Sequence, residues 1–115
     1  MTMTLNATSI RDAKDISPTE VEVPEWGGSL YVREMSVKQR WDFQKRFASE
    51  TESDDRPELW LLINGTCNED GDAIFKDGDR EWLAEKSGRV VESVALEVLR
   101  ANGLADDALD EAGNG

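Results

Sequence analysis

Apolar and polar residues alternate in two short runs near the start of the chain, at residues 21–23 and 30–32. This period of two is typical of half-buried strands. The segment between the runs begins with Pro24, which has a fixed φ angle. Near its end are two adjacent glycines, Gly27 and Gly28, which can adopt positive φ. The pattern predicts a β-hairpin with Trp26 at its turn.

A helix is expected directly after the hairpin, over residues 37–48. Ser36 and Gln39 have the spacing of a capping box, in which the hydroxyl accepts from the backbone three residues on and the amide side chain reaches back. The apolar residues of the segment, Trp41 among them, fall within an arc of about 160° at about 100° per residue. That arc is wide for a surface helix.

A second helix is predicted to begin at Pro57, with Asp54 or Asp55 as its cap, after a polar and acidic loop. Residues 59–63 are apolar on all sides, so periodicity alone does not separate a buried helix from a buried strand. The Asn-Gly pair at 64–65 is typical of a helix C-cap and favours the helix. We expect this element at the centre of the core.

Residues 66–75 predict a short second hairpin that turns at Asp70 and Gly71. The spacing superficially resembles a calcium-binding loop, but Thr66 replaces the opening aspartate and Asp77 replaces the closing glutamate. A plain Asp-Gly turn without a metal ion is therefore expected.

Two more helices are predicted in the last third of the chain. Asp79 is placed to cap the first, over residues 80–86, which would present Trp82 to the core. The second, over residues 89–101, carries a compact apolar stripe. The Asn-Gly-Leu run at 102–104 that follows is typical of a Schellman motif.

Together these elements predict a small α+β domain over residues 17–104, in which an N-terminal β-hairpin is followed by about four helices and a short second hairpin. Residues 1–16 are mostly polar, with scattered apolar side chains, and are expected to form a mobile arm. Residues 105–115 hold four acidic and no basic side chains, which predicts an acidic tail that is disordered without a partner.

Composition narrows the functional classes. A chain of 115 residues, 38% hydrophobic and 33% charged, is one small domain with a modest core. No run approaches the roughly 20 apolar residues that span a bilayer, and the first residues do not resemble a signal peptide. We therefore expect a cytoplasmic protein without membrane contact.

The residues needed for common catalytic and metal sites are scarce. Cys67 is the only cysteine and the chain has no histidine, which excludes an internal disulfide and disfavours a zinc site or a cysteine nucleophile. The Trp-Gly-Gly run lacks the lysine and the glycine spacing of a phosphate-binding loop. We expect neither enzymatic activity nor a cofactor.

Charge is unevenly distributed along the chain. The formal net charge of −12, from 25 acidic and 13 basic side chains, disfavours binding of nucleic acid. Residues 33–46 hold five basic and two acidic side chains, whereas residues 50–58 hold five acidic and one basic. Either the first predicted helix has a solvated basic face, or copies of the chain associate head to tail through this segregation.

The four tryptophans are numerous for a small domain. Trp41, Trp60 and Trp82 each fall on the apolar face of a predicted helix, and we expect them in the core. Trp26 either folds over the hairpin onto the core or stands exposed as an anchor for a partner. The candidate partner-binding residues are Trp26, Gly27, Gly28, Arg40, Lys45 and Arg46.

Two parts of the chain resemble a known family. The first part resembles the N-terminal signature of tail assembly chaperones from long-tailed, siphovirus-type bacteriophages. The resemblance lies in the run Glu20-Val-Glu-Val-Pro-Glu-Trp-Gly-Gly28, in the run Leu30-x-Val-Arg-Glu-Met-Ser36, and in Arg40 and Phe43. The later run Asp70-Gly71-x-x-Ile-Phe75 is similar to the second half of that family, and the likeness covers about residues 16–104.

This resemblance implies a non-enzymatic chaperone of phage tail assembly. Such a protein binds and solubilises the tape measure protein and helps to recruit the tail tube protein. It works in many copies in the host cytoplasm and is not expected in the mature virion. The composition leaves a different class open, an acidic DNA mimic that inhibits a host nucleic-acid enzyme, although the basic first helix would interrupt its acidic face.

Overall fold

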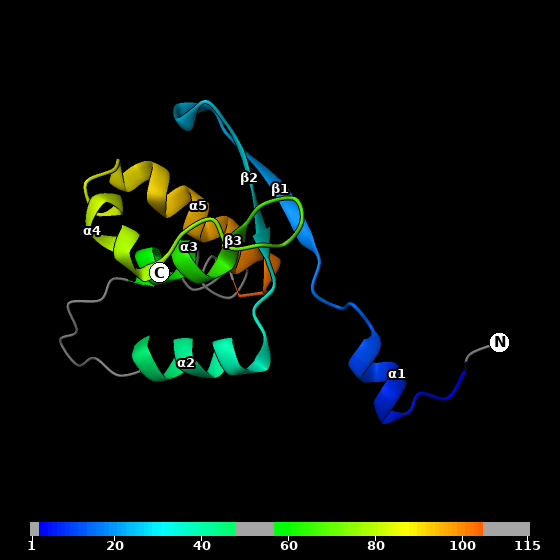
Figure 1. Cartoon of the computed structure of the whole chain (residues 1–115). Coiled ribbons are helices and arrows are strands. Elements are labelled where there is room, and N and C mark those ends of the chain that lie inside the picture. The colour runs from blue at the N-terminus through cyan, green and yellow to red at the C-terminus, as the bar shows by residue number, and fades with distance from the viewer. Residues whose placement is uncertain (1–2, 48–56, 105–115) are drawn as a thin grey trace, which may run out of the picture.

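The structure, a computed structural model, describes residues 3–47 and 57–104. Figure 1 shows a small antiparallel sheet with helices on one side of it and beneath it. The strands, in sheet order, are β1 (Pro18–Val23), β2 (Gly28–Arg33) and β3 (Thr66–Cys67). The helices are α1 (Ala7–Asp12), α2 (Val37–Phe47), α3 (Pro57–Gly65), α4 (Arg80–Leu83) and α5 (Gly88–Ala101), with short 3-10 turns η1 (Pro24–Trp26) and η2 (Asp77–Asp79). The α+β prediction, a hairpin followed by four helices, is confirmed.

The predicted hairpin is formed by β1 and β2, which pair from Pro18 opposite Arg33 to Val23 opposite Gly28. Its turn is η1, and Gly27 after it has φ of +80°. Gly28 does not have positive φ and already belongs to β2, so the expectation that both glycines need left-handed backbone is wrong for Gly28. One left-handed residue suffices because the 3-10 turn supplies the rest of the reversal.

The second predicted hairpin differs from the observed structure in its pairing. β3 pairs with β2, Tyr31 opposite Cys67, and becomes the third strand of the same sheet. The expected turn is present: Gly71 has φ of +87°, and the Asn68 N–H donates to the Asp72 carbonyl over 2.8 Å. The segment after this turn runs as a loop to η2, so β3 remains an edge strand of the sheet.

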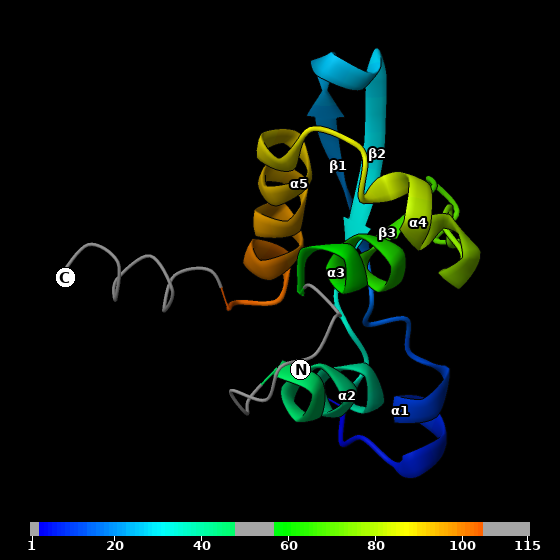
Figure 2. The same ribbon diagram turned by 90° about the vertical axis from the view of Figure 1, so that its left-hand side faces the viewer.

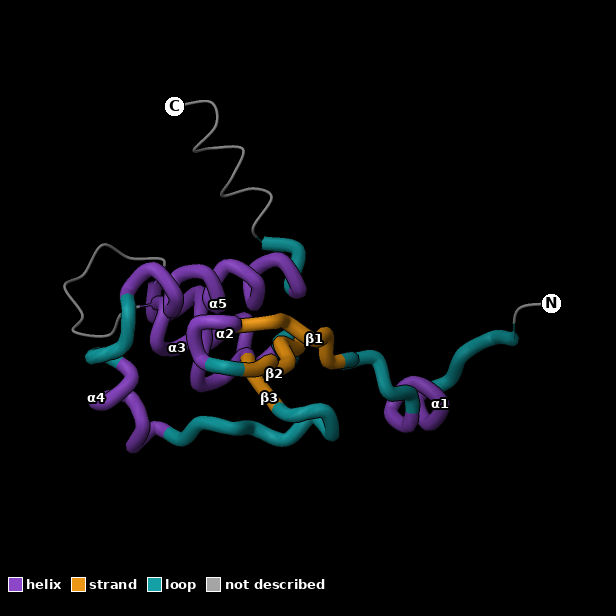
Figure 3. The backbone as a smooth tube through the Cα atoms, turned by 90° about the horizontal axis from the view of Figure 1, so that it is seen from above, coloured by secondary structure: helices purple, strands orange, loops and turns teal. Residues whose placement is uncertain are grey.

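The core lies between the sheet and helices α3 and α5, which lie side by side in Figure 3. Leu62 of α3 and Val98 of α5 are fully buried, and Trp60 is 3% exposed, as predicted for the apolar run. Gly65 is the last residue of α3 and lacks the positive φ of a C-cap glycine. Its role is close approach instead, because a Cβ there would overlap the Val98 side chain.

Helix α5 matches the sequence prediction closely. It begins at Gly88, one residue early, with the Ser87 side chain as its cap. The Leu104 N–H donates to the Leu99 carbonyl over 2.9 Å and the Gly103 N–H donates to the Arg100 carbonyl over 3.1 Å. With φ of +69° at Gly103, this is the predicted Schellman motif.

Helix α4 ends at Leu83, earlier than predicted, and Asp79 does not cap it through its side chain. The Asp79 carboxylate instead accepts from the Lys76 backbone N–H over 2.8 Å and from the Trp82 indole N–H over 2.9 Å. These hydrogen bonds, the backbone one first, lower the pKa of Asp79 because they favour its ionised form. The acidic residue therefore fixes the tryptophan ring and the loop before α4.

The N-terminal segment contains α1, a six-residue helix capped reciprocally by Asn6 and Ser9, in which no residue is buried. It lies apart from the sheet in Figure 1. The mobility expected for residues 1–16 stays a prediction. The expected helix end at Ala48, the loop 49–56 with its caps Asp54 and Asp55, and the acidic tail 105–115 lie outside the described residues.

Candidate protein-binding surfaces

Helix α2 is anchored at its N-terminal end. The predicted capping box is present: the Ser36 N–H donates to Gln39 Oε1 over 3.0 Å, and the Gln39 N–H donates to Ser36 Oγ over 3.2 Å. The Asn102 amide joins the preceding connector to the end of α5, since its Oδ1 accepts from the Met35 N–H over 2.6 Å and its Nδ2 donates to the Val98 carbonyl over 2.8 Å. The start of α2 is therefore fixed to the core.

One edge of α2 packs on α3. Phe43 and Phe47 contact each other at 5.2 Å between ring centroids, and they contact Trp60 at 5.4 and 6.4 Å. Both phenylalanines are only partly buried, and none of the residues of α2 is fully buried. Figure 2 shows the helix below the body of the molecule, consistent with contact along one side.

The opposite edge of α2 is uncovered. Trp41 is 67% exposed and Val37 is 68% exposed, so the prediction that Trp41 lies in the core is wrong. The physical reason is the width of the apolar arc, which α3 covers only at the two phenylalanines. A shallow groove runs along this outer side, and its lining residues are Lys38, Trp41, Asp42, Gln44 and Lys45.

The basic residues of α2 point in different directions. Lys38 and Lys45 line the groove beside Trp41. Arg46 pairs with Asp42, with 3.4 Å between Nε and Oδ1. Arg40 lines a separate hollow with residues 100–103 at the end of α5. We define the outer face of α2 as Val37, Lys38, Trp41, Asp42, Gln44 and Lys45. It carries two exposed apolar side chains flanked by two lysines, and its one carboxylate, Asp42, is paired with Arg46.

A second aromatic surface lies at the hairpin tip. Trp26 is half-buried and packs against the core, so it adopts the first of the two placements considered above while keeping part of its surface open. It lines a cleft of about 360 Å³ with Phe75 and Trp82, together with Leu83 and the charged residues Glu25 and Lys86. Trp82 is 45% exposed, so its predicted place in the core is also wrong.

The structure does not bring the six predicted partner-binding residues together. Trp26, Gly27 and Gly28 lie at the hairpin tip, whereas Arg40, Lys45 and Arg46 lie on α2 at the far end of the molecule in both Figures 1 and 2. Sequence reasoning missed three exposed or half-exposed aromatic residues, Trp41, Phe75 and Trp82. The excess of tryptophan for so small a core was a signal for Trp41 and Trp82, whereas nothing in the sequence pattern marked Phe75.

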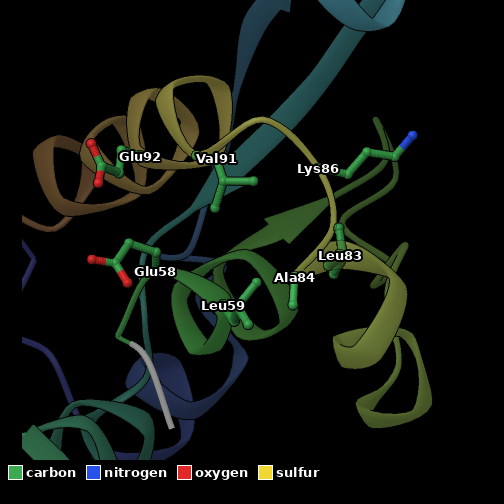
Figure 4. Close-up of a pocket in the computed structure, with 8 residues that line it drawn as sticks. Glu58, Leu59, Leu83, Ala84, Lys86, Val91 and Glu92 are labelled. Carbon is green, nitrogen blue, oxygen red and sulfur yellow. The ribbon is translucent and has the colours of Figure 1, made fainter.

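A further cavity, of about 300 Å³, lies between α3, α4 and α5. Figure 4 shows the carboxylates of Glu58 and Glu92 on one side of it and Lys86 directed away on the other, with Leu83 and Val91 between them. Within residues 3–47 and 57–104, no group of three or more His, Cys, Asp or Glu side chains could hold a metal ion. Cys67 is buried, and burial raises the pKa of its thiol, which keeps it protonated.

Comparisons with known proteins give one matching family profile and one shared fold. The profile of the phage tail assembly chaperone family matches residues 5–113. The solved structure of the bacteriophage HK97 tail assembly chaperone superposes with a TM-score of 0.55 over 82% of this chain and 90% of that chain, at 22% sequence identity. At this identity the superposition shows a shared fold. No curated protein sequence matches the chain.

None of the described helices is long and apolar enough to cross a membrane.

Proposed function

Because this chain belongs to the phage tail assembly chaperone family, we propose that it binds the tape measure protein, keeps it soluble and helps to recruit the tail tube protein. In this proposal it acts without catalysis in the host cytoplasm and leaves before the virion is complete. The fold supports a binding role, since the described residues expose aromatic side chains with charged neighbours on a small domain.

The observation that carries the proposal is the outer face of α2. An exposed tryptophan and valine on adjacent turns form an apolar stripe, and Lys38 and Lys45 flank it. Such a stripe fits the apolar seam of an amphipathic helix, with the lysines placed to meet acidic residues beside that seam. Long helical proteins expose seams of this kind before they assemble, and covering them prevents aggregation.

The charge of the whole chain supports a solubilising role. At a formal −12, copies bound along a partner would give the complex a large net charge, which opposes precipitation. The same basic helix on an acidic body supports head-to-tail self-association and argues against a DNA mimic, which needs a continuous acidic surface. If charge drives that association, oligomers detected by light scattering shrink as salt rises, and the variant Lys45→Glu with Arg46→Glu stays monomeric.

Co-expression tests the proposal. The tape measure protein of the same phage is expressed alone, with the wild-type chain, with Trp41→Ser, and with Ile10→Ser, a matched control that removes an exposed apolar side chain of α1. We expect the wild type and the control to bring the tape measure protein into the soluble fraction, and Trp41→Ser to lose most of that effect. A tape measure protein that stays insoluble with the wild-type chain would refute the proposed function. Equal rescue by Trp41→Ser would refute the role of α2.

A further inference from the structure

Three aromatic side chains from separate segments line the cleft at the hairpin tip. Trp26 comes from η1, Phe75 from the loop before η2, and Trp82 from α4. The ring centroids of Phe75 and Trp82 are 6.0 Å apart and the ring planes are inclined by 58°. The indole N–H of Trp82 is already donated to Asp79, so what this ring offers a ligand is its face.

The lining of this aromatic cleft includes one carboxylate, Glu25, and one ammonium group, Lys86. A second carboxylate, Asp79, accepts from the indole N–H of Trp82 beside the cleft. The nearest partner of Glu25 is Arg89, at 3.9 Å between Oε2 and Nη1, with side chains 45% and 83% exposed. Exposed pairs of this kind contribute little, so an incoming cation can replace Arg89 easily.

Aromatic faces beside carboxylates attract cations. The negative face of an indole ring favours a guanidinium or ammonium group within about 6 Å of its centroid, and a carboxylate at the rim supplies the opposite charge. We propose that the cleft formed by Trp26, Phe75 and Trp82 binds a basic side chain presented by a protein partner, with Glu25 as its counter-charge. This is a second docking site, chemically opposite to the basic outer face of α2, and the two surfaces share no residue.

Lys86 provides a sharp test because it lines the same cleft. Its ammonium group repels an incoming cation, whereas an apolar ligand would be indifferent to it. Glu25→Gln and Lys86→Gln therefore have opposite expected effects on a cationic ligand. Both positions are at the rim, so neither change removes a buried contact.

The experiment uses the full chain, isotopically labelled, and follows the indole N–H signals of its four tryptophans by NMR. The probe is the blocked peptide acetyl-Gly-Ser-Arg-Ser-Gly-amide, titrated to millimolar concentration, and the control peptide carries uncharged citrulline in place of arginine. Phenylalanine variants of the individual tryptophans assign the signals. We expect the arginine peptide to shift Trp26 and Trp82 and to leave Trp41 and Trp60 unchanged, and we expect citrulline to bind at least about threefold more weakly.

Variants then separate charge from shape. Glu25→Gln should weaken binding of the arginine peptide about threefold and Lys86→Gln should strengthen it about threefold, as expected for one exposed charge each. Trp82→Leu should abolish the shifts, while Trp41→Leu, a matched control, should leave them intact. Circular dichroism and thermal melting of each variant check that it is folded.

Three results would overturn the proposal. Equal binding of the citrulline peptide would show a site for apolar or neutral groups. Unchanged affinity in both Glu25→Gln and Lys86→Gln would show that charge has no part in recognition. A peptide-free oligomer that dissociates in Trp82→Leu would show that a second copy of the chain occupies the cleft. Failure of the wild-type chain to solubilise the tape measure protein in co-expression would refute the proposed function. It would leave this cleft untouched, since the peptide titration measures binding at the cleft by itself.

Discussion

Helices α2 and α3 are neighbours, and each carries one tryptophan, yet the two residues have opposite environments. Trp60 of α3 is 3% exposed and Trp41 of α2 is 67% exposed. Helix α3 lies against α5 and the strand that follows it, whereas α2 meets α3 along the Phe43 and Phe47 edge. An apolar stripe on a helix therefore shows what the helix can bury, and the number of neighbours decides what it does bury. The surplus on α2 is the surface available to a partner.

Truncating the buried tryptophan should have the largest effect on this comparison. Trp60→Ala removes a ring that contacts both phenylalanines of α2 and should lower the free energy of unfolding by about 3–5 kcal/mol. Urea denaturation followed by circular dichroism measures the change. A loss below about 1 kcal/mol would contradict the central position of α3, since typical surface changes stay within roughly 0.5 kcal/mol.

The close approach of α3 and α5 predicts the next largest effect. Gly65→Ala places a methyl group against Val98 and should cost about 1–3 kcal/mol of stability through overpacking. Val98→Ala in the same chain removes the obstructing methyl groups. The double variant should therefore be more stable than the sum of the two single losses implies, and strict additivity would show that the two residues do not collide.

Substitutions of the two turn glycines should have smaller and unequal effects on stability. Gly27→Val forces a β-branched residue into φ of +80° and should cost about 1–3 kcal/mol. Gly28 has ordinary strand φ and no described atom within 4 Å of a Cβ added to it, so Gly28→Val should change stability by less than about 0.5 kcal/mol. Thermal melting compares the stability of the two variants. Equal losses of stability would show that the chain reversal between β1 and β2 does not depend on positive φ at Gly27.

The exposed tryptophan should matter least for stability. Trp41→Ser removes a side chain that projects into solvent, so the free energy of unfolding should stay within about 0.5 kcal/mol of the wild type. Together with Trp60→Ala, this variant measures the contrast between the two helices directly. A loss of several kcal/mol would mean that α2 packs more tightly than its exposure indicates.

Local signals predicted much of the fold. The hairpin, the capping box at Ser36, and the Schellman motif at Gly103 depend on residues a few positions apart, and all three are confirmed. The errors share a different origin. Pairing of β3 with β2 and the role of Gly65 depend on partners more than thirty residues away, which periodicity and turn chemistry do not report.

The candidate surfaces were predicted less completely than the fold. Trp26 and Lys45 were identified, but they proved to lie on separate surfaces. The sequence pattern predicts Trp41 and Trp82 in the core, because an aromatic residue on an apolar helix face has the same pattern whether or not a neighbour covers it. Only the tertiary arrangement shows which faces stay open.

Oxidative footprinting of the two tryptophans tests the central claim most directly. The chain is exposed to hydroxyl radicals alone and in complex with the tape measure protein, and mass spectrometry quantifies modification of Trp41 and Trp60. We expect Trp41 to be modified readily in the free chain and to become protected in the complex, while Trp60 is protected in both. Equal modification of Trp41 with and without the tape measure protein would contradict the assignment of α2 as the docking helix.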